Sequence, residues 1–289
     1  MQSNFEQLLF LGSARLTLAC AKYCQSFNLP LELFDTGSNP SKVLESQARA
    51  SGIPYAHLEQ TRLKSHLKSL SKPALIISAA NPYLIPAAVL ENEHIRAINC
   101  HNALLPRHPG RNAEAWAIFE QDAGSGITWH FITPEVDAGN ILIQQSIALD
   151  ASFTSLSLHN QQHKLAFQSF QQIIPDVLME RIQGMPQDLS RRAELHYSWQ
   201  IPNNGYLDLA WHADKISAFL RAMDYGILET LGKPRVEFDG GCYYWRCYSI
   251  EKMPQSLLQE KVEIRHNNLH IQKDGASVIL RDIKNVDQS

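Results

Sequence analysis

The sequence predicts an α/β fold followed by a small β-rich domain. In the first two-thirds of the chain, short apolar runs such as Gln7–Leu11 and Ala74–Ser78 alternate with stretches of helical periodicity. Strands that alternate with helices are typical of a parallel sheet with crossover helices. From Val236 onward, short strand-like runs are separated by turn residues at Asn267-Asn268 and Asp274-Gly275, which indicates antiparallel strands.

The elements of the first region follow from these patterns in chain order. We predict strands at Gln7–Leu11, Leu31–Phe34, Ala74–Ser78, Ile95–Cys100, Ile127–Ile132 and Ile141–Ile147. The segments between and after them carry apolar residues at helical spacing. We predict helices at Ala14–Gln25, Pro40–Ala50, Thr61–Leu70, Ala113–Glu120 and Ser155–Ile182, the last of them kinked or interrupted at Pro175.

The second region begins after a polar segment, Gly184–Gln200, which we interpret as a linker. A helix is expected at Ala210–Met223. Short strands are expected at Val262–Arg265, Leu269–Gln272 and Val278–Leu280. We therefore expect a catalytic domain over residues 1–190 and a small C-terminal domain over residues 205–289.

The composition is that of an ordinary globular protein and excludes several classes. The 289 residues are 44% hydrophobic and 19% charged, with a net charge of −3. No apolar run reaches the ~18 residues of a membrane-spanning helix, and the surplus of Lys and Arg that nucleic-acid binding requires is absent. Five cysteines without a CxxC pair do not indicate a disulfide framework or a zinc site, and the first ten residues lack a secretory signal. We expect a cytoplasmic protein that binds no membrane.

The most informative block contains a candidate catalytic set. Asn99 and His101 lie two residues apart at the carboxyl end of a predicted strand, so their side chains point to one face, toward the crevice where open α/β sheets bind ligands. Asp137, in a glycine-bearing turn, is placed to meet His101. An amide can donate to an oxyanion, an imidazole can move a proton, and a carboxylate can orient the imidazole. The set suits acyl transfer to a nucleophile that the substrate brings, such as an amine. A histidine that is only hydrogen-bonded is the alternative.

The sequence of this block resembles that of the folate-dependent formyltransferases. The resemblance lies in NCHNALLPRHPG, followed by GITWH and VDAGNI, with a separation of 137 − 99 = 38 between Asn99 and Asp137 that fits the family. Upstream, NPYLIP at Asn81–Pro86 is similar to the segment that lines the family's pterin pocket. The resemblance implies a Rossmann-like, mostly parallel sheet with flanking helices and a small OB-like C-terminal domain. The family includes glycinamide ribonucleotide, methionyl-tRNA and amino-sugar formyltransferases.

The same resemblance implies a donor, a mechanism and a set of binding residues. The donor would be 10-formyltetrahydrofolate, the acceptor an amine, and no metal would take part. Asn99 would polarise the formyl oxygen and hold the oxyanion, His101 would assist proton transfer, and Asp137 would orient His101. The pterin would be bound by two segments that flank the cleft. Their residues are Tyr83, Leu84 and Ile85, and Ala138, Gly139 and Asn140.

Three further residues are candidates for binding the acceptor. Ser13 opens a predicted helix after the first strand, where a phosphate could bind, although a plain turn explains the pattern as well. Arg107 and Arg111 surround the Leu-Leu-Pro turn and could contact an anionic acceptor or the folate tail. Solvated side chains are the alternative for both arginines.

The histidines and Cys100 also invite a functional interpretation. His94, His101, His108 and His130 suggest a metal, but no pair of them has helical spacing with an acidic partner, so we expect no metal site. Cys100 lies between Asn99 and His101, and strand alternation turns it toward the core.

Several acceptors remain open within the resemblance. Three segments look most like those of amino-sugar and natural-product formyltransferases, namely GRNAEAWAIF, GITWH and Arg221–Phe238. This similarity favours a nucleotide-linked amino sugar as the acceptor. An amino acid or a carrier-bound aminoacyl group is the close alternative. The net charge and the absence of a basic insertion around Asp35–Lys42 disfavour methionyl-tRNA as the acceptor. The absence of a glycine-rich loop near the N-terminus disfavours a purine-pathway enzyme. Formyltetrahydrofolate hydrolysis, a catalytically silent binding module and a homodimer stay open.

Overall fold

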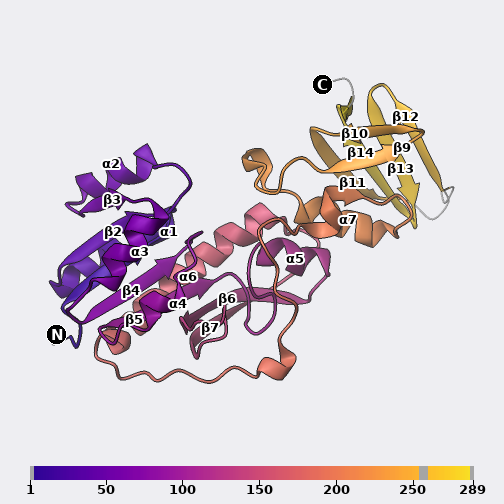
Figure 1. Cartoon of the computed structure of the whole chain (residues 1–289). Coiled ribbons are helices and arrows are strands. Elements are labelled where there is room, and N and C mark those ends of the chain that lie inside the picture. Colours follow the sequence, from indigo (N-terminus) through magenta and orange to yellow (C-terminus); the bar gives the residue numbers. More distant parts are fainter. Residues whose placement is uncertain (1–2, 254–259, 287–289) are drawn as a thin grey trace. The chain divides into compact units, whose positions relative to one another are not determined.

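The computed structural model describes residues 3–253 and 260–286 of the chain (Figure 1). A seven-stranded sheet has the strand order β3-β2-β1-β4-β5-β6-β7. Its strands are β1 Gln7–Leu11, β2 Leu31–Asp35, β3 Tyr55–His57, β4 Ala74–Ala79, β5 Ile95–His101, β6 Gly124–Phe131 and β7 Ile141–Ala148. The helices that accompany them are α1 Arg15–Cys24, α2 Lys42–Ala50, α3 Gln60–Lys68, α4 Ala87–Leu90, α5 Ala113–Phe119 and α6 Ser155–Leu178.

The predicted α/β sheet is confirmed, and it is mostly parallel. Strands β1 to β5 pair in parallel, whereas β6 runs antiparallel to β5. The sequence missed β3 and α4, because three half-buried strand residues and four helical ones are too few for a periodic signal. Helix α6 continues through Pro175 to Leu178, so the proline does not interrupt the helix there.

The chain divides into two compact units that interleave in sequence. Unit 1 comprises Met1–Gly110, Gly126–Ser146 and Gln161–Leu195. Unit 2 comprises Arg111–Ser125, Ile147–Asn160 and His196–Ser289. The domain boundaries expected from the sequence, 1–190 and 205–289, follow the chain order instead and stay a prediction.

In unit 1, the sheet buries apolar residues on both faces. Strand residues alternate, so Ile98 and Cys100 of β5 face the core packed by α1, α2 and α6, while Ile95 and Ala97 face the core packed by α3 and α4. Burial on both faces explains the near-continuous apolar strand β4, in which all six residues are buried. Asn99 and His101, which alternate with Ile98 and Cys100, therefore face the α3 and α4 side at the end of the strand.

Trp129 fixes the antiparallel strand β6 against helix α6. Its side chain is fully buried, its indole Nε1 donates to the Ala166 carbonyl at 2.9 Å, and its ring lies 5.2 Å from that of Phe170. Because β6 is the neighbour of β5, this contact also supports the strand that holds Asn99 and His101.

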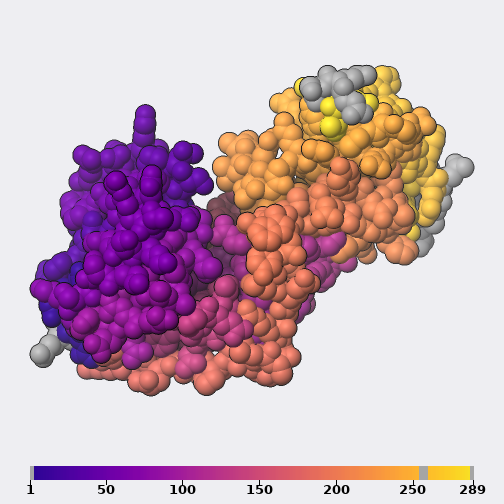
Figure 2. Space-filling view, in the orientation of Figure 1, coloured from indigo at the N-terminus to yellow at the C-terminus, as the bar shows by residue number. Residues whose placement is uncertain are grey.

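In unit 2, the C-terminal residues form two four-stranded sheets, and the space-filling view shows these residues, coloured orange to yellow, as a compact body (Figure 2). The sheet orders are β15-β10-β9-β8 and β11-β14-β13-β12. The strands are β8 Tyr206–Leu207, β9 Arg235–Phe238, β10 Gly241–Tyr244, β11 Cys247–Lys252, β12 Lys261–Arg265, β13 Asn268–Lys273, β14 Ala276–Arg281 and β15 Lys284–Asn285, and helix α7 spans Ala213–Ala222. Strands β8 and β9 pair in parallel, whereas the pairs β9–β10, β10–β15, β11–β14, β12–β13 and β13–β14 are antiparallel, which confirms the predicted β-rich region.

Within the described ranges, none of the helices is both long and apolar enough to cross a membrane.

Replacing Trp129 with Phe tests the anchoring of β6. The change removes the donor to Ala166 and part of a fully buried ring. We expect the unfolding free energy to fall by about 2–4 kcal/mol in urea unfolding followed by circular dichroism. Trp199→Phe is the matched control, because Trp199 is 74% exposed, and it should cost less than about 0.5 kcal/mol. Equal losses in the two variants would contradict the anchoring role.

Candidate active site

Strand β5 brings three polar side chains together across neighbouring strands. Asn99 is paired in register with Ser78 of β4 on one side and with His130 of β6 on the other. The Ser78 hydroxyl lies 2.7 Å from Asn99 Oδ1, and Asn99 Nδ2 lies 3.2 Å from His130 Nε2. Paired residues of adjacent strands share a face, so Asn99 and His101 project together as the sequence predicts.

One hydrogen bond of His101 identifies the ring nitrogen that is available for proton transfer. Nε2 lies 2.7 Å from the carbonyl oxygen of His108, and Nδ1 lies 3.6 Å from Asp137 Oδ2. A carbonyl oxygen carries no proton, so Nε2 must donate to it. Nδ1 is therefore the ring atom that takes up or releases a proton, and it faces a carboxylate. The side chain is only 7% exposed, which protects this arrangement from bulk water.

The turn that carries Asp137 is held in a defined, left-handed conformation. Asp137 has a φ of +53°, which Asp adopts more readily than most residues. A Cβ atom at Gly139 would run into the Phe131 carbonyl oxygen, so only glycine fits there. Gln187 Nε2 donates to the carbonyls of both Asp137 and Gly139, at 2.8 Å each. The sequence contains no local signal for Gln187, which lies 50 residues beyond Asp137.

Asp137 is the electrostatic centre of the cluster. Its side chain is 9% exposed, and Oδ2 accepts the backbone N–H of Gly110 at 2.7 Å. Burial alone would raise the pKa of this carboxyl, but the charge of His101 and the hydrogen bonds from His130 and Gly110 outweigh burial and hold the pKa below its ordinary value. The carboxylate is therefore ionised at neutral pH.

His130 is a member of the cluster that the sequence analysis did not assign. Its Nδ1 lies 2.8 Å from its neighbour's carbonyl, Phe131 O, and must donate to it. Its Nε2 lies 3.2 Å from Asn99 Nδ2 and 3.4 Å from Asp137 Oδ1. A protonated Nε2 donates to Asp137, whereas an unprotonated Nε2 accepts from Asn99. The GITWH motif contained this residue, but only the strand register shows that it opposes Asn99.

Among the described residues that border the cluster, neither Ser78 nor Cys100 is an activated nucleophile. The Ser78 hydroxyl is directed to Asn99 Oδ1, an amide oxygen that cannot act as its base. Cys100 is buried in the opposite core, as the sequence predicts, and burial raises the pKa of its thiol, so the reactive thiolate is suppressed. The geometry therefore suits a reaction in which one substrate attacks another.

The two segments expected to bind a pterin both belong to unit 1. Tyr83 and Ile85 are buried, whereas Leu84 is 68% exposed. Ala138 and Asn140 are half-buried in the Asp137 turn, and Asn140 O accepts the Phe131 N–H at 2.9 Å. Within residues 3–253 and 260–286, the Tyr83 hydroxyl has no hydrogen-bond partner, although it is buried. An orphaned hydroxyl of this kind is what a ligand with a polar edge would satisfy.

The three candidate acceptor-binding residues are half-buried or exposed. Ser13 is half-buried in unit 1, and its backbone N–H donates to the Ala80 carbonyl at 3.3 Å. Arg107 is exposed in unit 1 and Arg111 is exposed in unit 2. Their contact with an acceptor stays a prediction.

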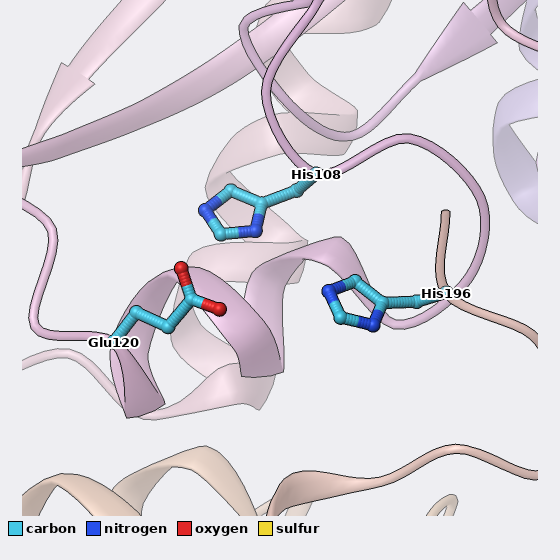
Figure 3. Close-up of side chains that lie close together, drawn as sticks. All are labelled: His108, Glu120 and His196. Carbon is cyan, nitrogen blue, oxygen red and sulfur yellow. The ribbon is translucent and has the colours of Figure 1, made fainter. Parts of the chain in front are cut away.

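Two side chains of unit 2 have metal-ligand chemistry and lie close together (Figure 3). A carboxylate oxygen of Glu120 and a ring nitrogen of His196 are within 4.8 Å of each other. His196 also stacks on Trp116, with ring centres 4.0 Å apart. His108, which is also labelled in Figure 3, belongs to unit 1 and is not counted with them. Zinc sites use three or four protein ligands. Two side chains within one unit are too few, so we assign no metal to this pair.

Comparison with known proteins places the chain in a family. A model of the family described as formyl transferase matches residues 24–174, which is more than half of the 289 residues. The chain belongs to the formyl transferase family. This membership agrees with the resemblance read from the NCHNALLPRHPG block.

Curated relatives match part of the chain. Over 172 residues it is 28% identical to GDP-perosamine N-formyltransferase of Brucella melitensis biotype 1, covering 60% of this chain and 64% of that protein. Over 189 residues it is 31% identical to methionyl-tRNA formyltransferase of Akkermansia muciniphila, covering 63% of this chain and 58% of that protein. The chain thus spans less than two-thirds of the length of the curated relatives it matches.

A solved structure shares the fold over nearly the whole chain. The N-formyltransferase from Helicobacter canadensis, determined with folinic acid and dTDP-3-aminofucose, superposes with a TM-score of 0.75. The match covers 96% of this chain and 99% of that chain at 14% sequence identity. At this identity the likeness concerns the fold.

Acidification tests the electrostatics of Asp137. A carboxyl whose pKa is lowered on folding stabilises the folded state above its unfolded pKa of about 3.9, and that stabilisation is lost as the pH falls through the folded pKa. We expect the difference in unfolding free energy between the wild type and Asp137→Asn to shrink by about 2 kcal/mol as the pH falls below about 5, because the carboxylate becomes protonated. Urea unfolding at several pH values measures the difference. A difference that does not change with pH would contradict the lowered pKa of Asp137.

Proposed function

We propose that this protein transfers the formyl group of 10-formyltetrahydrofolate to a primary amine of a small molecule. The amine nitrogen bonds to the formyl carbon, and the bond from that carbon to the folate nitrogen breaks. The amine loses one proton and the folate nitrogen gains one, so the protein needs an oxyanion donor and a proton carrier but no oxidant. Asn99, His101 and Asp137 supply this chemistry.

The observation that carries the proposal is the buried contact between His101 and an ionised Asp137 beside Asn99. Asn99 donates to the developing oxyanion from its amide nitrogen. His101 holds or moves a proton at Nδ1, because Nε2 is committed to the His108 carbonyl. Asp137 Oδ2, 3.6 Å from Nδ1, keeps the imidazole in its orientation. Ser78 and Cys100 are not set up as nucleophiles, so attack by a substrate amine fits the site better than acylation of the protein.

The donor fits the candidate pterin-binding residues in one specific respect. The buried hydroxyl of Tyr83 lacks a partner among the described residues, and Tyr83 is one of the residues that we expected to bind the pterin. We propose that the backbone of the Tyr83–Ile85 and Ala138–Asn140 segments binds the rest of the pterin edge. All these residues precede residue 190, which supports a catalytic region over residues 1–190.

The acceptor that we propose is an amino sugar linked to a nucleotide. Support comes from the similarity to a GDP-perosamine N-formyltransferase and to a structure determined with dTDP-3-aminofucose. Methionyl-tRNA is the second candidate, because a relative with that name is 31% identical, although the net charge of −3 does not favour it. An amino acid or carrier-bound acceptor is a third.

We place the reaction in the cytoplasm, and we propose that Ser13, Arg107 and Arg111 contact the acceptor.

An acceptor screen tests this function. The protein is incubated with 10-formyltetrahydrofolate and, in separate reactions, with nucleotide-linked amino sugars, amino acids and methionyl-tRNA, and products are identified by mass spectrometry. We expect a nucleotide sugar to gain one formyl group. Formate release without any amine would indicate a hydrolase, and a lack of turnover with every acceptor would indicate a silent binding module. Light scattering of the same preparation tests for a homodimer.

Substitution of the catalytic pair tests the roles within the site. We expect His101→Ala and Asp137→Asn each to lower kcat by at least about 100-fold, because proton transfer and its electrostatic support are lost. Folate binding, measured by calorimetry, should persist. His212→Ala is the matched control, because His212 contacts Asp274 in unit 2 with a side chain that is 89% exposed. Near-full activity in either active-site variant would refute the role of that residue.

A further inference from the structure

A chain of hydrogen bonds behind Asn99 begins at a residue whose amide orientation is fixed by the backbone. Asn81 Oδ1 accepts the N–H of Tyr83 at 2.9 Å, and Asn81 Nδ2 donates to the Tyr83 carbonyl at 2.9 Å. A backbone N–H can only donate and a carbonyl can only accept. The Asn81 amide therefore has one allowed orientation. The hydroxyl of Thr36 adds a third contact, 2.6 Å from Asn81 Oδ1.

The fixed amide of Asn81 makes Ser78 the acceptor in the contact between them. Asn81 Nδ2 lies 3.0 Å from Ser78 Oγ and donates to it. Ser78 Oγ lies 2.7 Å from Asn99 Oδ1, which can only accept. Because Asn81 is the donor in the first contact, the Ser78 proton is available for Asn99. If the Asn99 amide were reversed, two N–H groups would meet Ser78 Oγ, and the buried Ser78 proton would lose Asn99 as its acceptor. Ser78 is 3% exposed, so water does not readily compete for this proton.

The direction of the Ser78 hydroxyl in turn orients Asn99. With Oδ1 held on the β4 side, Nδ2 lies on the opposite side of the amide, 3.2 Å from His130 Nε2 on β6. The two ends of an asparagine amide are nearly equal in size and opposite in polarity. Without the contact to Ser78, the amide could rotate by half a turn at little steric cost and present its oxygen to the reacting centre.

We propose that Asn81 and Ser78 are positioning residues for the formyl transfer, and that they keep the donor end of the Asn99 amide directed at the reacting oxygen. This inference rests on the proposed function, in which Asn99 stabilises an oxyanion. An amide oxygen in that place would repel the developing negative charge, whereas a pre-oriented N–H stabilises it without reorganisation. The residues act through Asn99 and need not touch the substrate.

A double-mutant cycle separates positioning from a structural role. Ser78→Ala removes the proton that holds Asn99, and we expect kcat to fall about 10-fold to 100-fold with folate affinity unchanged. In an Asn99→Ala background the same change should alter kcat by less than about twofold, because the group it orients is absent. A loss of equal size in both backgrounds, or no loss in the wild type, would overturn the proposal. Ser169→Ala, which removes another buried hydroxyl of unit 1, is the control.

Asn81→Asp is a second variant that keeps the shape of the side chain. A carboxylate cannot donate to Ser78, so the Ser78 proton turns toward Asp at this position and Asn99 loses its partner. We expect a fall in kcat of the same order as in Ser78→Ala, and a change of less than about twofold when Asn81→Asp is made in an Asn99→Ala background. If Asn81→Asp retains wild-type kcat, the relay through Ser78 is wrong.

The orientation of Asn99 also has a readout that does not require activity. In the wild type, nuclear Overhauser contacts should join the Asn99 amide protons to the His130 ring, because Nδ2 and Nε2 are 3.2 Å apart. These contacts should weaken in Ser78→Ala and persist in Ser169→Ala. Unchanged contacts in Ser78→Ala would overturn the proposal, whereas correct contacts in a protein without formyl transfer would contradict the proposed function alone.

Discussion

The site depends on one buried carboxylate. Asp137 is nearly enclosed, and an isolated carboxylate in such a place would be neutralised or would destabilise the fold. The protein instead surrounds it with a backbone N–H from Gly110 and two imidazoles, His101 and His130. The same contacts that stabilise the charge bring the imidazoles to fixed positions. Electrostatic compensation and catalytic geometry are therefore provided by the same atoms.

The surrounding backbone is built to keep that carboxylate in place. Asp137 and His108 both have left-handed conformations, each of which costs of the order of 1 kcal/mol, and both contact His101 directly. Gln187 secures the Asp137 turn from a distant segment, and Gly139 allows the close approach to β6. These features give a rigid site in which little reorganisation accompanies the change in charge during the reaction.

The sequence predicted the part of this arrangement that depends on local pattern. Alternation along β5 was enough to place Asn99 and His101 on one face and Cys100 on the other. His130, Ser78 and Gln187 were not assigned, because their roles depend on which strand or loop lies beside Asn99 and Asp137. Strand register and long-range loop contacts are set by the packing of the whole sheet. Local patterns in a single sequence therefore do not reveal them. The short elements β3 and α4 were missed for a related reason, since their positions are fixed by neighbours rather than by periodicity.

The central claim is that an acceptor amine, rather than a side chain of the protein, attacks the formyl carbon. The most direct measurement is the intact mass of the protein, followed by mass spectrometry while it is mixed first with 10-formyltetrahydrofolate and then with the amine. If the amine attacks directly, we expect the protein mass to stay unchanged throughout and the formylated amine to form only after the second addition. A protein that gains one formyl group from the donor and loses it to the amine would contradict the account.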